Sequence, residues 1–329
     1  MRAFFLLFLI SFGCLAGNPG SPEYGAYHEA RTGNESANAS SAGFTETEPR
    51  PALAPENTTP AQENVSERAD VISRNSDALS EKVIPSAGIT LPARWNDIGP
   101  RIVEGGALNI TRFEALLERN GRPLTMEQRA ILENGSDDFI RIDRNNSYFV
   151  LNLFWALGLT NDNKILRNFS AGIGSTAVGN LASTGFWSLG ERSGRELFAS
   201  RKIIELTGSQ QAIVEEVTAG TYRPCCDNPT AFPDCNHGMA ALGLAEWMAY
   251  QNASGEEIYG ALLAANSYWF PQAYVETAAY LEYQNVSWES LEARELLSAN
   301  YSSYSGYQTT KRKLEDFPPV LLAGSGCGA

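Results

Sequence analysis

Tyr148-Phe-Val-Leu-Asn-Leu-Phe-Trp-Ala-Leu157 is an apolar run that contains one polar residue, Asn152. Asn146 stands before the run where it could cap a helix, and Gly158 follows it as a stop signal. A helix that is apolar on all sides is buried on all sides. We therefore expect a central buried helix, around which the other elements pack. The run is too short to cross a bilayer, which needs about 20 residues.

Amphipathic segments with helix-start signals lie on both sides of this run. Thr125-Met-Glu-Gln128 and Ser254-Gly-Glu-Glu257 have the capping-box pattern, in which the first and fourth residues bond each other's backbone. Residues 139–143 alternate and predict one short strand. The pattern as a whole predicts an all-α fold, a compact multi-helix domain of about ten short helices. The expected helices span residues 98–104, 112–119, 125–133, 148–157, 195–205, 209–218, 239–251, 254–269, 271–283 and 287–299.

Composition divides the chain into four parts. A positive residue followed by roughly ten apolar ones predicts a signal peptide over residues 1–16. Cleavage after Ala16 competes with a lipoprotein signal at Cys14. Residues 17–90 are rich in Pro, Ser, Thr, Asn and Glu and poor in aromatics, which predicts a disordered low-complexity stalk. The all-helical globular domain is expected over residues 91–316, followed by a C-terminal tail over 317–329.

Two properties of the whole chain bear on its compartment and partners. A net charge of −13 without a basic stripe argues against nucleic-acid binding. Eleven Asn-x-Ser/Thr triplets occur where this composition gives about three by chance, which predicts N-linked glycans. We expect an exported protein at the cell surface or outside the cell, held at the membrane if Cys14 is lipidated. The triplets begin at residues 34, 38, 57, 64, 109, 134, 145, 168, 252, 285 and 300.

Three of the five cysteines and one of the two histidines lie within thirteen residues, as Cys225, Cys226, Cys235 and His237. Thiolate and imidazole groups are the donors that Zn²⁺ and softer metals prefer. Met239 follows Cys235 by one helical turn and would add a thioether donor suited to copper. The spacing predicts a site for a transition metal or metallocofactor, copper or zinc first and iron after them, with redox activity as a further option. It is not a standard zinc signature.

Residues around these donors are expected to support them. Pro224 and Pro233 fix backbone angles at the two ends of the loop. Asp234 or Asn236 could cap the following helix, and Cys235 would then lie near the positive helix end, which favours thiolate. The expected supporting residues are Asp227, Asp234, Asn236 and Glu246.

The same cysteines have two other uses that the sequence leaves open. In an oxidising compartment, disulfides Cys226–Cys235 and Cys225–Cys327 would staple the loop and the tail of a structural protein. Free thiols would instead serve a thiol-disulfide oxidoreductase or a nucleophile. A Gly-x-Ser-x-Gly hydrolase motif does not occur, and the glycine-rich stretch 170–190 lacks the strand and lysine of a phosphate loop. The sequence assigns no reaction to the site.

Overall fold

The computed structural model describes residues 76–315, all of which belong to one unit of the chain. The predicted signal peptide with Cys14, most of the predicted stalk, and the predicted tail with Cys327 lie outside the described residues. The first four predicted glycosylation sites lie outside them as well.

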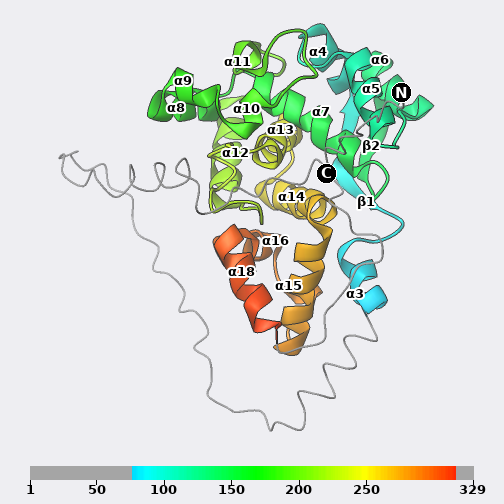
Figure 1. Ribbon diagram of the computed structural model, residues 1–329, viewed down its shortest axis with the longest axis vertical. Coiled ribbons are helices and arrows are strands. Elements are labelled where there is room, and N and C mark those ends of the chain that lie inside the picture. The colour runs from blue at the N-terminus through cyan, green and yellow to red at the C-terminus, as the bar shows by residue number, and fades with distance from the viewer. Residues whose placement is uncertain (1–75, 316–329) are drawn as a thin grey trace, which may run out of the picture. The chain divides into compact units, whose positions relative to one another are not determined.

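The described residues are mostly helical, which confirms the predicted fold class (Figure 1). They contain sixteen α-helices, one 3-10 helix and a two-stranded sheet. The elements are α3 (Ser76–Val83), β1 (Ile89–Asn96), α4 (Ile98–Glu104), α5 (Ile110–Arg119), α6 (Met126–Asn134), β2 (Ser136–Ile142), α7 (Ser147–Thr160), α8 (Lys164–Ile173), α9 (Ser175–Val178), α10 (Ala182–Gly185), α11 (Gly194–Leu197), α12 (Gly208–Gly220), α13 (Asn236–Tyr250), α14 (Gly255–Trp269), α15 (Pro271–Tyr283), η1 (Trp288–Ser290), α16 (Ala293–Leu296), α17 (Ala299–Ser302) and α18 (Tyr304–Lys313).

The predicted central helix is α7, and it crosses α13 at very short range. Both helices are buried along nearly their whole length. A Cβ on Gly158 of α7 would lie 2.1 Å from the Met239 carbonyl oxygen, and one on Gly243 of α13 would lie 2.2 Å from the Phe154 carbonyl oxygen. Two glycines therefore let the backbones touch.

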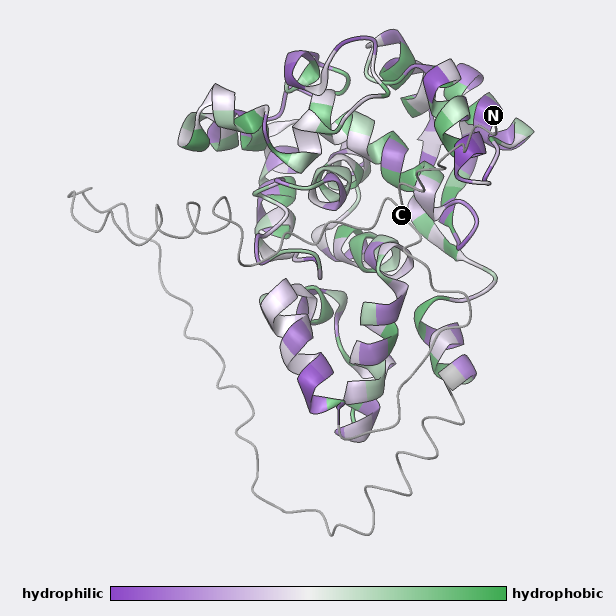
Figure 2. Ribbon diagram, viewed as in Figure 1, coloured by the Kyte–Doolittle hydropathy of each residue, from purple (hydrophilic) through white to green (hydrophobic). Residues whose placement is uncertain are grey.

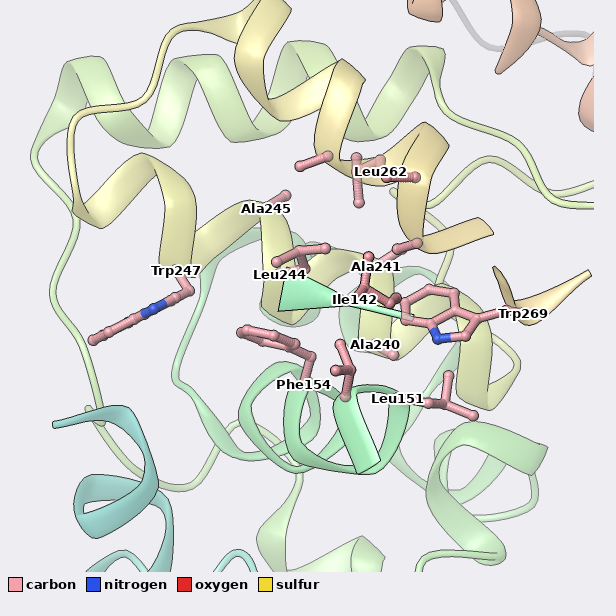
Figure 3. Close-up of a cluster of buried hydrophobic side chains, with 14 of the residues drawn as sticks. Ile142, Leu151, Phe154, Ala240, Ala241, Leu244, Ala245, Trp247, Leu262 and Trp269 are labelled. Atoms are coloured by element: carbon pink, nitrogen blue, oxygen red, sulfur yellow. The ribbon is translucent and has the colours of Figure 1, made fainter. Parts of the chain in front are cut away.

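Figure 3 shows the side chains beside this crossing. Leu151 and Phe154 of α7 lie against Ala240 and Ala241 of α13, with Trp269 of α14 next to them. Small residues on α13 thus lie opposite large ones on α7, and all of them are buried. Away from it, α18 is largely hydrophilic and ends in three basic residues (Figure 2). Among the described residues, none of the helices combines the length and the apolar character that crossing a membrane requires.

The two capping boxes are confirmed. The side chain of Thr125 accepts from the Gln128 backbone while Gln128 bonds back to Thr125. Ser254 and Glu257 form the same reciprocal pair at the start of α14. These local signals fix where α6 and α14 begin.

The sheet and the start of the domain differ from prediction. The expected strand at 139–143 is the end of β2, which pairs antiparallel with β1. We did not predict β1, although alternate residues Leu91, Ala93 and Trp95 are buried, because Pro92 interrupts the pattern. Leu79 of α3 is also buried in the core. The folded part therefore starts well before residue 91, and the predicted stalk boundary at 90 is too late.

The predicted helix over 195–205 is wrong beyond its first turn. A capping box of Ser193 and Glu196 starts α11, but this helix ends at Leu197. Ala199 then has a positive φ of 48°, and Arg201 pairs with Asn161 beyond the end of α7. Pairing with another segment overrides the local helical pattern there. The predicted helix over 287–299 is likewise split into η1 and α16, with α17 beginning at its end.

A first prediction concerns the crossing of α7 and α13. We expect Gly243→Ala to lower the free energy of unfolding by about 1–3 kcal/mol or more, because its new methyl group meets backbone that cannot rotate away. Gly260→Ala, in a helix interior with open space around it, is expected to raise that free energy by about 0.5–1 kcal/mol. Urea titration monitored by circular dichroism measures both. Equal effects of the two substitutions would show that the crossing is loosely packed.

Candidate metal centre

The loop between α12 and α13, residues 221–235, is called the cysteine loop here. It turns back onto the end of α12, where the Thr230 amide donates to the Thr221 carbonyl at 2.8 Å. The Asp227 carboxylate accepts from the amide and hydroxyl of Ser305, 2.7 and 2.8 Å away, at the first turn of α18. The Tyr304 amide donates to the Cys226 carbonyl at 2.9 Å. The loop is thus fixed at both ends and along its middle.

Cys235 is the N-cap of α13, although Asp234 and Asn236 were the predicted caps. Its Sγ accepts from the Gly238 amide at 3.4 Å, and its backbone is extended. Asp234 is unavailable for capping because Arg223 and Asn228 take its carboxylate. The cap position directs the Cys235 sulfur toward the positive end of the helix.

The cysteine loop and the first turn of α13 bring the predicted donors together. Cys225 Sγ and Cys235 Sγ lie 3.5 Å apart. The ligand atoms of Cys225, Cys235 and His237 all lie within 4.8 Å of one another, and we call this group the outer triad. Cys226, Asp234 and Cys235 meet the same criterion and form the inner triad. All three cysteines of the described part are unbonded thiols, so the alternative Cys226–Cys235 disulfide is not formed.

Arg223 is the residue that sequence analysis missed. Its side chain is fully buried and donates from Nε to Cys235 Sγ at 2.9 Å and from Nη2 to Asp234 Oδ1 at 2.5 Å. The same guanidinium donates to the carbonyls of Asn228 and Phe232, 3.0 and 3.3 Å away. One signal could have found it: Arg223 is the only lysine or arginine between residues 202 and 294.

The three thiols have different acidities. Hydrogen bonds from Cys225 and Cys226 lower the pKa of Cys235 well below its ordinary value, and Arg223 and His237 add to this against the effect of burial. Donation to its two neighbours raises the pKa of Cys225 well above the ordinary value. Cys226 accepts from Cys225, which lowers its pKa, but donation to Cys235 and burial bring that pKa to about 12. Cys235 is therefore the most acidic of the three thiols.

Two charged side chains, those of Asp234 and Arg223, lie beside Cys235. Burial raises the pKa of Asp234, while Arg223 acts in the opposite direction. Burial alone would lower the pKa of Arg223, but Cys235, Cys226 and Asp234 hold it well above its ordinary value. The guanidinium is thus a permanent positive charge within the cluster.

His237 lies on the first turn of α13 with its ring against Phe270, 4.3 Å between centroids. Its Nε2 atom is buried and has no hydrogen-bond partner among the described residues. Buried polar nitrogens are nearly always paired, so an unpaired one indicates a missing partner. A water molecule or a metal ion can supply that partner.

The other predicted residues lie in different surroundings. Met239 is fully buried in the core, beside the α7 crossing. Asn236 is the first residue of α13 and is half-buried. Glu246 is fully buried away from the cluster donors and accepts from Asn161 Nδ2 at 2.8 Å, and burial raises its pKa well above the ordinary value. Glu246 lies about three turns of α13 beyond Cys235.

The structure therefore contains a Cys/His group within metal-binding distance, beside the buried guanidinium of Arg223. Comparison of the chain with protein-family models, curated proteins and solved structures found no match. Assignment of the site rests on its geometry and donor chemistry.

A second prediction concerns Arg223. Arg223→Met leaves Asp234 and Cys235 without their buried counter-charge, so we expect the free energy of unfolding to fall by about 3–5 kcal/mol. Arg294 is the matched control because its Nη2 also lies 2.5 Å from a carboxylate, that of Glu216, yet its side chain is 49% exposed. Arg294→Met should cost less than about 1 kcal/mol. Similar losses for the two variants in urea denaturation would refute the structural role of Arg223.

Proposed function

We propose that this protein binds one thiophilic transition-metal ion, copper or zinc first, through Cys225, Cys235 and His237. The observation that carries the proposal is the approach of two sulfurs to 3.5 Å, with a ring nitrogen of His237 within 4.8 Å of both. The three donors come from two places in the chain, the loop and the helix start, that the fold holds together.

The spacing of the donors fits a tetrahedral ion. Two sulfurs bound at about 2.3 Å to such an ion lie about 3.8 Å apart. The distance between Cys225 Sγ and Cys235 Sγ differs from this by a few tenths of an ångström. Small side-chain rotations would therefore complete the geometry.

The donor set and its protonation support a soft or borderline ion. Thiolates and imidazole favour zinc and copper over Mg²⁺ or Ca²⁺, and iron follows them. The pKa of Cys235 is lowered and that of Cys225 is raised, so Cys235 deprotonates first. Binding should release the Cys225 proton, so affinity should increase with pH.

The third prediction tests metal binding. Reduced protein dialysed against Zn²⁺ or Cu⁺ should retain about one ion per chain, measured by elemental mass spectrometry. Cys235→Ser and His237→Ala should each lose most of that metal because each removes one ligand. Met239→Leu is the control, since the Met239 side chain is buried in the core, and should keep it. Wild type that retains no more metal than Cys235→Ser would refute the proposal.

We also propose that the protein is exported and glycosylated. The apolar N-terminus and the excess of Asn-x-Ser/Thr triplets support this. Asparagines 134, 145, 168, 252, 285 and 300 are exposed, whereas Asn109 is half-buried and donates to Glu191 Oε1 at 2.5 Å. The glycan acceptors are therefore accessible on the folded domain, with one exception.

The fourth prediction tests export. The full chain expressed in a eukaryotic secretory host should appear in the medium or on the cell surface, and a glycosidase should lower its mass. Deletion of residues 1–16 should abolish both outcomes because the targeting signal is lost. An intracellular, glycan-free full-length product would contradict the proposal.

Thiol redox chemistry is the second candidate function. It is favoured by the same 3.5 Å approach and by the lowered pKa of Cys235, since a thiolate is the form that attacks a disulfide. Turnover of a disulfide substrate by protein that retains no metal would assign this role instead.

A further inference from the structure

The inner triad already contains a cation. Arg223 directs Nε at Cys235 Sγ and Nη2 at Asp234 Oδ1, and these two acceptors are two of its three members. The third member, Cys226, has its sulfur 3.9 Å from Asp234 Oδ1. The guanidinium therefore occupies two of the three side chains that a metal ion in the inner triad would need as ligands.

Arg223 has no room to leave this position. Two loop carbonyls, those of Asn228 and Phe232, take its other hydrogen bonds. A Cβ on Gly238, in the first turn of α13, would lie 2.5 Å from the guanidinium carbon. Glycine at this position lets the helix backbone pack directly on the guanidinium.

A fixed positive charge repels a metal ion placed among the same donors. The outer triad differs, because Cys225 is exposed and the hydrogen bonds of Arg223 reach one of its three members, Cys235. Cys235 is shared, so it can accept from Arg223 on one side and bind a metal ion on the other. The inner triad is thus occupied by the side chain of Arg223, whereas the outer triad can bind a ligand.

We infer that Arg223 is a specificity-determining residue that fills the inner triad, so that the centre takes one metal ion on Cys225, Cys235 and His237 and excludes Cys226. The inference rests on the proposed metal binding and defines its ligand set. Three protein ligands leave the fourth tetrahedral position to a donor from outside, next to the exposed Cys225. Sites with three protein ligands are typical of catalytic or exchanging zinc, and four-ligand sites of structural zinc.

The test compares the same substitution, Cys to Ser, at two adjacent positions, Cys225 and Cys226. The probe is Co²⁺, because its absorption spectrum reports both the number of bound thiolates and the coordination number. Wild type should bind one Co²⁺ per chain. Cys226→Ser should bind it with an affinity within about threefold of wild type and with unchanged thiolate-to-cobalt absorption. Cys225→Ser should lose at least tenfold in affinity and about half of that absorption. Circular dichroism checks that both variants are folded.

The open position gives a second readout on wild-type protein alone. Added imidazole or 2-mercaptoethanol should shift the visible cobalt bands, because it would take the fourth position. Two cobalt ions per chain, equal losses in the two serine variants, or bands that do not respond to added donor would each overturn the inference. Wild type that binds no Co²⁺, Zn²⁺ or Cu⁺ would instead refute the proposed function itself, so the two failures are distinct.

Discussion

The close contact between the backbones of α7 and α13 determines where the candidate centre can form. Gly158 and Gly243 allow it, since a side chain at either position would collide with a carbonyl of the other helix. Gly158 faces the carbonyl of Met239, one turn from Cys235. The start of α13 is thereby held against the buried core, and the cysteine loop is fixed to it through Arg223. The packing of α7 against α13 in the interior thus fixes where the polar groups at the start of α13 lie.

Charge organises the loop as packing organises the helices. Four acceptor groups of the loop meet at one buried guanidinium, which the protein could not bury unpaired. Cys235 and Asp234 supply the compensating negative charge. The arrangement lowers the pKa of the Cys235 thiol at the helix start and raises that of its neighbour Cys225. A ligand site and a stabilising ion pair therefore share the same atoms.

Features that depend on neighbouring residues in the sequence were predictable, and features that depend on contacts between distant residues were not. The apolar run of α7 and the capping boxes at Thr125 and Ser254 specify their elements within a few residues. The approach of Cys225, Cys235 and His237 was also predictable, as part of a predicted set that included Cys226, because these donors are close in sequence. The role of Arg223 was not, since its four acceptors become neighbours only after the loop folds. The choice of Cys235 as the cap and the early end of α11 likewise depend on partners elsewhere in the chain.

X-ray absorption at the zinc edge of metal-loaded protein tests the central claim most directly. The account predicts two sulfur scatterers at about 2.3 Å and nitrogen or oxygen scatterers at about 2.0 Å, one of them with the outer-shell pattern of an imidazole. A spectrum with only oxygen and nitrogen neighbours, or without the imidazole pattern, would contradict the assignment of Cys225, Cys235 and His237 as the ligands.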